Sequence, residues 1–83
     1  MTRQEAIETI NPLKSKYEKS NLTGRDILNQ FNDNELIAYI ALATFAFGRS
    51  WVDSLDNARI HVQDRSKAIR LFGTQDQDLL GAR

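Results

Sequence analysis

The sequence predicts an all-α fold, a compact bundle of four to five helices around a central hydrophobic helix. Residues 36–47 are all apolar or aromatic except Thr44, and this run is too long and too rich in alanine for a typical strand. The flanking segments place apolar residues three or four positions apart, as amphipathic helices do. One proline and four glycines leave few breaks in 83 residues.

The length and charge of the chain limit the kind of protein it can be. Residues 1–83 are the size of one small domain, and we expect a single helical domain with a modest core. Lys plus Arg (11) equals Asp plus Glu (11), so the net charge provides no long-range attraction to nucleic acid or to an anionic membrane.

Two further observations bear on where the protein works. The chain has no cysteine, which excludes disulfides and cysteine-ligated metal sites. The apolar run of about a dozen residues is shorter than the ~20 that span a bilayer, and it starts too late for a signal peptide. We therefore expect a cytoplasmic protein with no membrane partner.

The first helix is expected to begin at a capping box formed by Thr2 and Glu5. Pro12 removes one amide donor from its interior, so the helix should kink there, or restart with Asn11 as its cap. Its apolar stripe consists of Ala6, Ile7, Ile10, Leu13 and Tyr17.

A short second helix should follow, capped by Thr23. Asn32 and Glu35 can form a capping box for the central helix, predicted over residues 33–47. Gly48 is suited to end that helix because glycine readily adopts positive φ. The apolar residues of the short helix are Ile27, Leu28 and Phe31.

A long helix is predicted over residues 51–72, with Ser50 and Asp53 at its start. Gly73 should end it, and residues 74–80 can add a last short turn holding two leucines. Its apolar stripe covers one side only, so we expect a half-buried surface helix. Its outer face alternates in charge through Asp56, Arg59, Asp64, Lys67 and Arg70.

The second half of the chain has an ordered set of residues that resembles a known family. An acidic residue and Leu-Ile-Ala precede the apolar run, and Gly48-Arg49, Trp51, Ala58-Arg59, Arg65, Ala68, Leu71, Gly73 and Leu79 follow it. Over residues 33–80 this order resembles the bacterial family known as domain of unknown function 3775. The resemblance implies a small helical domain of bacterial origin; since that family has no assigned activity, it implies no chemistry.

The chain offers few candidates for catalysis or metal binding. His61 is the only histidine, and with Asp64 on its face it would supply two metal ligands, which do not make a site. Glu35 suits the capping of a helix, and Thr44 suits a hydrogen bond to the carbonyl one turn earlier. We therefore predict no catalytic residue, no metal, no cofactor and no enzymatic activity.

The best candidates for partner binding lie between the central and the long helix. Trp51 and Arg49 are of the residue types that dominate binding energy at interfaces, and Phe47 adds apolar surface beside them. A lone tryptophan in the first turn of a helix in a small domain more often closes the core, and the two roles can coexist if the indole is half covered. We predict a protein–protein interaction module, acting as an adaptor, inhibitor or small subunit, and in the simplest case as a homodimer.

The alternative prediction is a nucleic-acid-binding regulator. Residues 44–60 have the length of a helix-turn-helix, and a basic stripe follows them. However, Asp53 and Asp56 at the start of the second helix would face phosphates, so nucleic acid is the less favoured partner. The basic stripe from Arg59 to Arg70 consists of Arg59, Arg65, Lys67 and Arg70.

Overall fold

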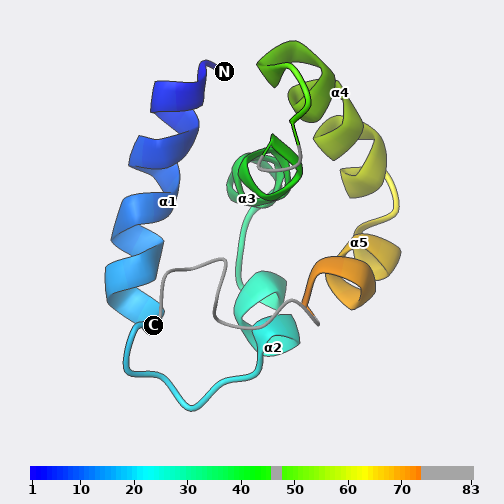
Figure 1. The fold of residues 1–83 in the computed structure, drawn as a ribbon. Coiled ribbons are helices and arrows are strands. Elements are labelled where there is room, and N and C mark those ends of the chain that lie inside the picture. The colour runs from blue at the N-terminus through cyan, green and yellow to red at the C-terminus, as the bar shows by residue number, and fades with distance from the viewer. Residues whose placement is uncertain (46–47, 74–83) are drawn as a thin grey trace.

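The computed structural model of the chain describes residues 1–45 and 48–73. Within these ranges it contains helices and no strand (Figure 1). The helices are α1 (Arg3–Tyr17), α2 (Gly24–Asn29), α3 (Asp33–Phe45), α4 (Trp51–Val62) and α5 (Arg65–Phe72). The predicted all-α bundle is therefore confirmed. The predicted turn over residues 74–80 lies outside the described residues.

α3 is the central helix of the bundle, as predicted. α1 packs against one side of it and α4 against another, and Figure 1 looks along its axis with these two helices on different sides. A helix that is apolar around most of its circumference needs such cover. Its buried side chains are Leu36, Ala38, Tyr39, Ile40, Ala41, Ala43 and Thr44.

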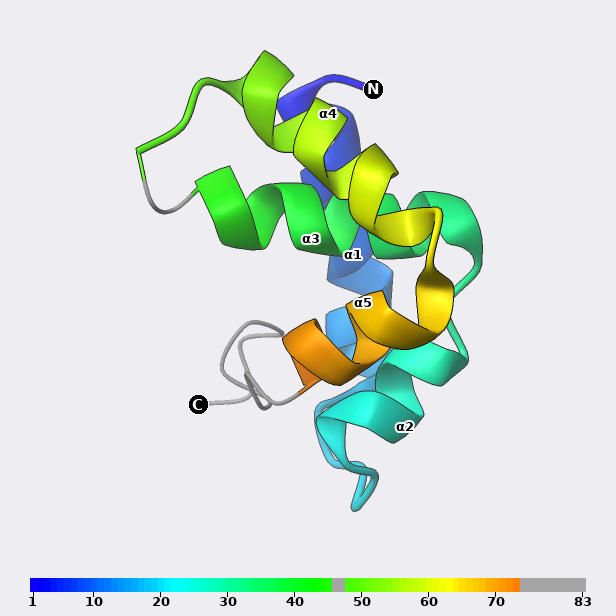
Figure 2. The same cartoon turned by 90° about the vertical axis from the view of Figure 1, so that its right-hand side faces the viewer.

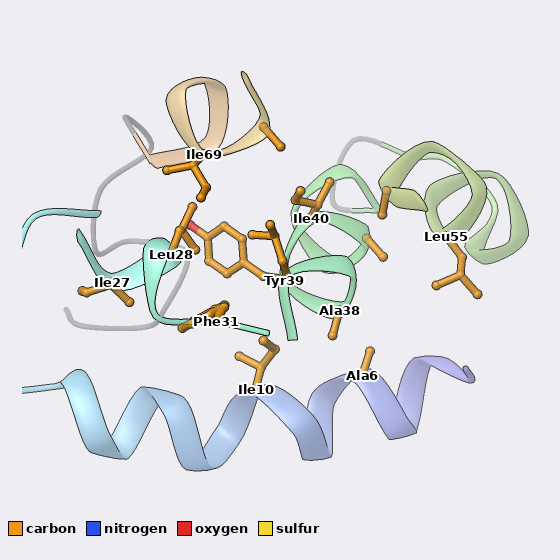
Figure 3. Packing of buried hydrophobic residues seen from close by; sticks show 14 of the residues in the cluster. Ala6, Ile10, Ile27, Leu28, Phe31, Ala38, Tyr39, Ile40, Leu55 and Ile69 are labelled. Atoms are coloured by element: carbon orange, nitrogen blue, oxygen red, sulfur yellow. The ribbon is translucent and has the colours of Figure 1, made fainter. Parts of the chain in front are cut away.

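One cluster of buried side chains draws on all of these helices. Figure 3 shows Ala6 and Ile10 pointing from α1 toward α3. Ala6 and Ala38 have no exposed surface, and such small side chains let two helices approach closely. Where α1, α2 and α3 meet, Phe31 packs between Tyr17 and Tyr39, with ring centroids 6.3 and 6.0 Å away.

The predicted caps at Thr2, Thr23, Asn32 and Ser50 are present. The Thr2 N–H donates to Oε1 of Glu5 at 2.7 Å, and the Glu5 N–H donates to Oγ1 of Thr2 at 3.1 Å. Asn32 and Glu35 form the same reciprocal pair at the start of α3, with both distances 2.8 Å. Each box satisfies two amides that the helix leaves free. The hydroxyl caps of α2 and α4 are Thr23 and Ser50.

α1 continues through Pro12, so the predicted restart at Asn11 is wrong. Asn11 and Pro12 are both exposed. Pro12 has no N–H to donate to the carbonyl of Glu8, but Glu8 is also exposed, so water can donate to that carbonyl instead. The opposite side of the helix is fixed to the core by Ala6 and Ile10. Packing on that side keeps α1 in one piece.

The single helix predicted over residues 51–72 is also wrong, because α4 ends at Val62 and α5 begins at Arg65. The Asp64 N–H donates to the carbonyl of His61 at 3.1 Å, and the Asp64 carboxylate accepts from the Lys67 N–H at 3.3 Å. Asp64 thus caps a new helix instead of belonging to an outer face. The break turns α5 away from α4 and onto α2 (Figure 2).

α2 and α5 come closest at two buried glycines. A Cβ added to Gly24 would overlap the carbonyl oxygen of Gly73. A Cβ added to Gly73 would lie 2.5 Å from Cγ of Arg25. The pair therefore serves close packing between the helices. Gly48 differs, because it has the positive φ (87°) expected of a residue that ends a helix.

Candidate protein-interaction surface

Trp51 is the first residue of α4 and lies where α4 meets the beginning of α1 and the end of α3. Its indole Nε1–H donates to the carbonyl oxygen of Met1 at 3.0 Å. Its ring meets the Phe45 ring edge-on, with centroids 5.8 Å apart and an interplanar angle of 79°. Contacts from two other parts of the chain therefore fix the orientation of a half-buried indole.

Arg3 extends this contact along α1. Its guanidinium carbon lies 5.0 Å from the centroid of the Phe45 ring. Such a cation–π contact contributes about 0.5–1 kcal/mol at an exposed site. The side chains of Arg3, Phe45 and Trp51 thus form a continuous series across three helices.

The surface at this junction is apolar and open to solvent. Met1 is 37% exposed, Val52, which follows Trp51 in α4, is 67% exposed, and Phe45 and Trp51 are half-buried. Exposed apolar groups that gather in one place mark interaction sites more often than scattered ones do. We call this surface the Trp51 patch. It consists of Met1, Arg3, Phe45, Trp51 and Val52.

The three residues predicted to bind a partner have different positions. Trp51 packs against the core and keeps part of its surface exposed, so its role in partner binding stays a prediction. Arg49 is exposed in the segment that leads into α4. Phe47 lies outside the described residues. Sequence reasoning missed Met1 and Arg3, since nothing local indicates that the chain's start contacts a residue fifty positions later.

A groove between α1 and α3 begins at Arg3, beside the patch. A hollow of about 200 Å³ lies there, and a smaller one of about 80 Å³ shares Ile10 and Leu42 with it. The larger hollow is also lined by Ile7 and Lys14. On α1, residues 3, 7, 10 and 14 follow one another at helical spacing on one side. The larger hollow therefore combines apolar side chains with the polar Asn11 and has a cation at either end.

The basic stripe from Arg59 to Arg70 is not a continuous surface. Arg59 lies beside Asp56, with Nη1 and Oδ1 3.6 Å apart. The Arg65 guanidinium turns inward, pairs with Asp33 at 2.9 Å and contacts backbone carbonyls at the end of α2. This inward turn follows from the helix break, which sequence periodicity did not show.

The residues considered for catalysis or metal binding make contacts that stabilise the fold. Glu35 accepts the Asn32 amide in the capping box, and Thr44 donates to the carbonyl of Ile40 at 3.0 Å. The His61 ring packs edge-on against Phe72, with centroids 5.1 Å apart. In the described ranges, no three side chains of metal-binding type gather into a site. The same part of the chain has no helix that is both long and apolar enough to cross a membrane.

Comparison with protein-family models, curated proteins and solved structures finds no match. The resemblance to domain of unknown function 3775 stays a prediction that rests on the residues quoted for it.

Proposed function

We propose that this protein is a small interaction module that binds a second protein molecule through the Trp51 patch. The observation that carries the proposal is the half-exposed indole, oriented by the Met1 carbonyl and by the Phe45 ring. Tryptophan is the residue type most enriched among those that dominate binding energy. A side chain that is already fixed also loses less conformational entropy when a partner covers it.

The surroundings of the indole suit a protein contact. Val52 and Met1 add exposed apolar area, and the exposed Arg49 and Arg3 can form a polar rim. The groove beside the patch continues the apolar surface past Ile7 and Leu42. In the simplest case the second molecule is another copy of the chain. With a different partner, the module is an adaptor, an inhibitor or a small subunit acting in the cytoplasm.

Paired substitutions at two exposed apolar residues test the proposal. Val52 lies in the patch at 67% exposure, and Ile60 lies on α4 outside it at 64%. We expect Val52→Asp to weaken the complex by roughly tenfold or more, because a carboxylate would be desolvated in the contact. Ile60→Asp should leave it unchanged. The complex is measured by sedimentation for self-association and by quantitative capture from a native extract for another partner.

The result that overturns the proposal is equally specific. If Val52→Asp leaves the complex intact, or if Ile60→Asp weakens it as much, the Trp51 patch does not form the contact. A chain that stays monomeric and captures nothing has no such function. The single tryptophan gives an independent readout, because its emission should shift to shorter wavelength when a partner covers the patch.

The nucleic-acid alternative has less support. Arg65 is engaged with Asp33 and the end of α2, and Arg59 has Asp56 beside it, which leaves Lys67 and Arg70 of the four basic residues. Two free cations provide little counterion release. Binding to duplex DNA at low salt that weakens steeply with added salt would favour this alternative over ours.

A further inference from the structure

A second surface feature lies between α2 and α5, and no residue of the Trp51 patch lines it. It is an open hollow of about 360 Å³, larger than the two beside α1. Two arginines, a side-chain amide and a hydroxyl line it above an apolar wall formed by Ile69. The polar lining residues are Arg25, Asn29, Ser66 and Arg70.

Two arginines line this hollow, and none of the described residues that line it is acidic. In the described part of the chain the ion pairs are Arg59 with Asp56 and Arg65 with Asp33, and neither involves Arg25 or Arg70. Guanidinium groups that lie close together repel each other, and an anion bound between them offsets this repulsion. The lining therefore has unused capacity for negative charge.

Backbone contacts fix the positions of the two helices that line the hollow. Gly24 and Gly73 bring α2 and α5 into near contact, and the Arg25 stem lies directly against Gly73. Arg65 fixes the far end of the same junction by contacting the carbonyl of Asn29. The backbone positions of Arg25 and Arg70 are thus set by the fold, which lowers the cost of bringing the two side chains together on binding.

We propose that this hollow binds a phosphate group. Guanidinium groups donate paired hydrogen bonds to tetrahedral oxyanions, and the Asn29 amide and the Ser66 hydroxyl supply further donors. A phosphate ester carries nearly two negative charges, which balances two arginines, whereas a carboxylate carries one. The ligand is a phosphorylated small molecule or a phosphorylated side chain of another protein. This site is separate from the Trp51 patch and does not depend on it.

Titrations of the full chain at constant ionic strength test this site. The probes are inorganic phosphate, O-phosphoserine and a phosphoserine peptide, with glutamate as the carboxylate control. We expect saturable shifts of the backbone amide signals of Arg25, Asn29, Ser66 and Arg70, and a higher melting temperature. A preference for the amino acid or the peptide identifies the source of the phosphate.

The matched variants are Arg25→Gln/Arg70→Gln and Arg59→Gln/Lys67→Gln, which remove the same charge from different places. The first should weaken phosphate binding by roughly tenfold or more, because it removes the charge-assisted hydrogen bonds. The second should leave binding unchanged, and helix content by circular dichroism should be the same in both. Equal loss in the two variants, equal binding of glutamate, or no saturable shift at millimolar phosphate would overturn the proposal.

Discussion

Nη1 of Arg65, at the start of α5, lies 2.9 Å from Oδ1 of Asp33, at the start of α3. Its Nη2 donates to the backbone carbonyls of Leu28, Asn29 and Phe31, in and just after α2. One guanidinium therefore joins three helices and supplies donors to carbonyl groups at the end of α2, where the Leu28 carbonyl also accepts from the Phe31 N–H.

Replacing Arg65 should destabilise the fold more than replacing Asp33. We expect Arg65→Ala to lower the free energy of unfolding by about 1–3 kcal/mol, because it leaves helix-end carbonyls unsatisfied. The side chain is one-third exposed, which favours the lower half of that range. Asp33→Asn should lower it by less than about 1 kcal/mol, since Asp33 is 73% exposed. Urea unfolding measures both, and equal losses would assign the effect to the ion pair alone.

The same substitution at a buried and at an exposed isoleucine tests whether α3 is the centre of the core. Ile40 has no exposed surface, and Ile60 is 64% exposed. Ile40→Ala should lower the free energy of unfolding by about 2–5 kcal/mol through lost burial and the cavity left behind. Ile60→Ala should change it by less than about 0.5 kcal/mol. A small effect at Ile40 in chemical unfolding would mean that α3 is not the centre of the core.

The contact between α2 and α5 is sensitive to a single methyl group. In Gly24→Ala the added Cβ would overlap the Gly73 carbonyl, so the helices must separate. We expect a loss of about 1–3 kcal/mol, as for other overpacked sites, despite the better helix propensity of alanine. Thermal unfolding measures this loss. A neutral or stabilising substitution would contradict the close approach of the two helices.

The capping box at Thr2 makes a prediction about pH. The Thr2 N–H is the main cause that lowers the pKa of the Glu5 carboxyl, and the Thr2 side chain adds to it. The folded pKa therefore lies below the unfolded one. The stabilisation of α1 is present above the unfolded pKa and is lost as the pH falls through the folded pKa.

Two variants separate the donors at Thr2. Thr2→Pro removes both the N–H and the hydroxyl. The φ of Thr2 is −83°, close to the value that proline adopts, so the backbone can accept the substitution. We expect the pKa of Glu5 to return toward its ordinary value. Thr2→Ala keeps the N–H and should retain the larger part of the shift. Carboxyl chemical shifts followed against pH give the values. An unchanged pKa in Thr2→Pro would show that the box does not form.

Local signals in the sequence predicted most of the helices and their starts. Capping residues such as Thr2 and Asn32 act within one turn, so their partners could be read from spacing alone. The break at Asp64 was missed because an aspartate on a charged face and an aspartate that caps a helix look the same in a periodic pattern. Pro12 does not end α1, because water can replace the lost amide bond on the exposed side of the helix.

The candidate sites depend on contacts that sequence spacing does not encode. Trp51 could be singled out as a residue type, but the carbonyl that orients its indole belongs to Met1. Arg25 and Arg70 lie on different helices, and they reach one hollow only because Gly24 and Gly73 bring α2 and α5 together. Such pairings arise from tertiary packing.

The most direct test of the interaction surface is photo-crosslinking in a native extract. A benzophenone-bearing residue is placed at position 52 in the Trp51 patch, or at position 60, which has similar exposure outside it. We expect a discrete crosslinked species from position 52, either a dimer of the chain or a complex with one other protein, and none from position 60. No adduct from position 52, or the same adducts from both positions, would contradict the account.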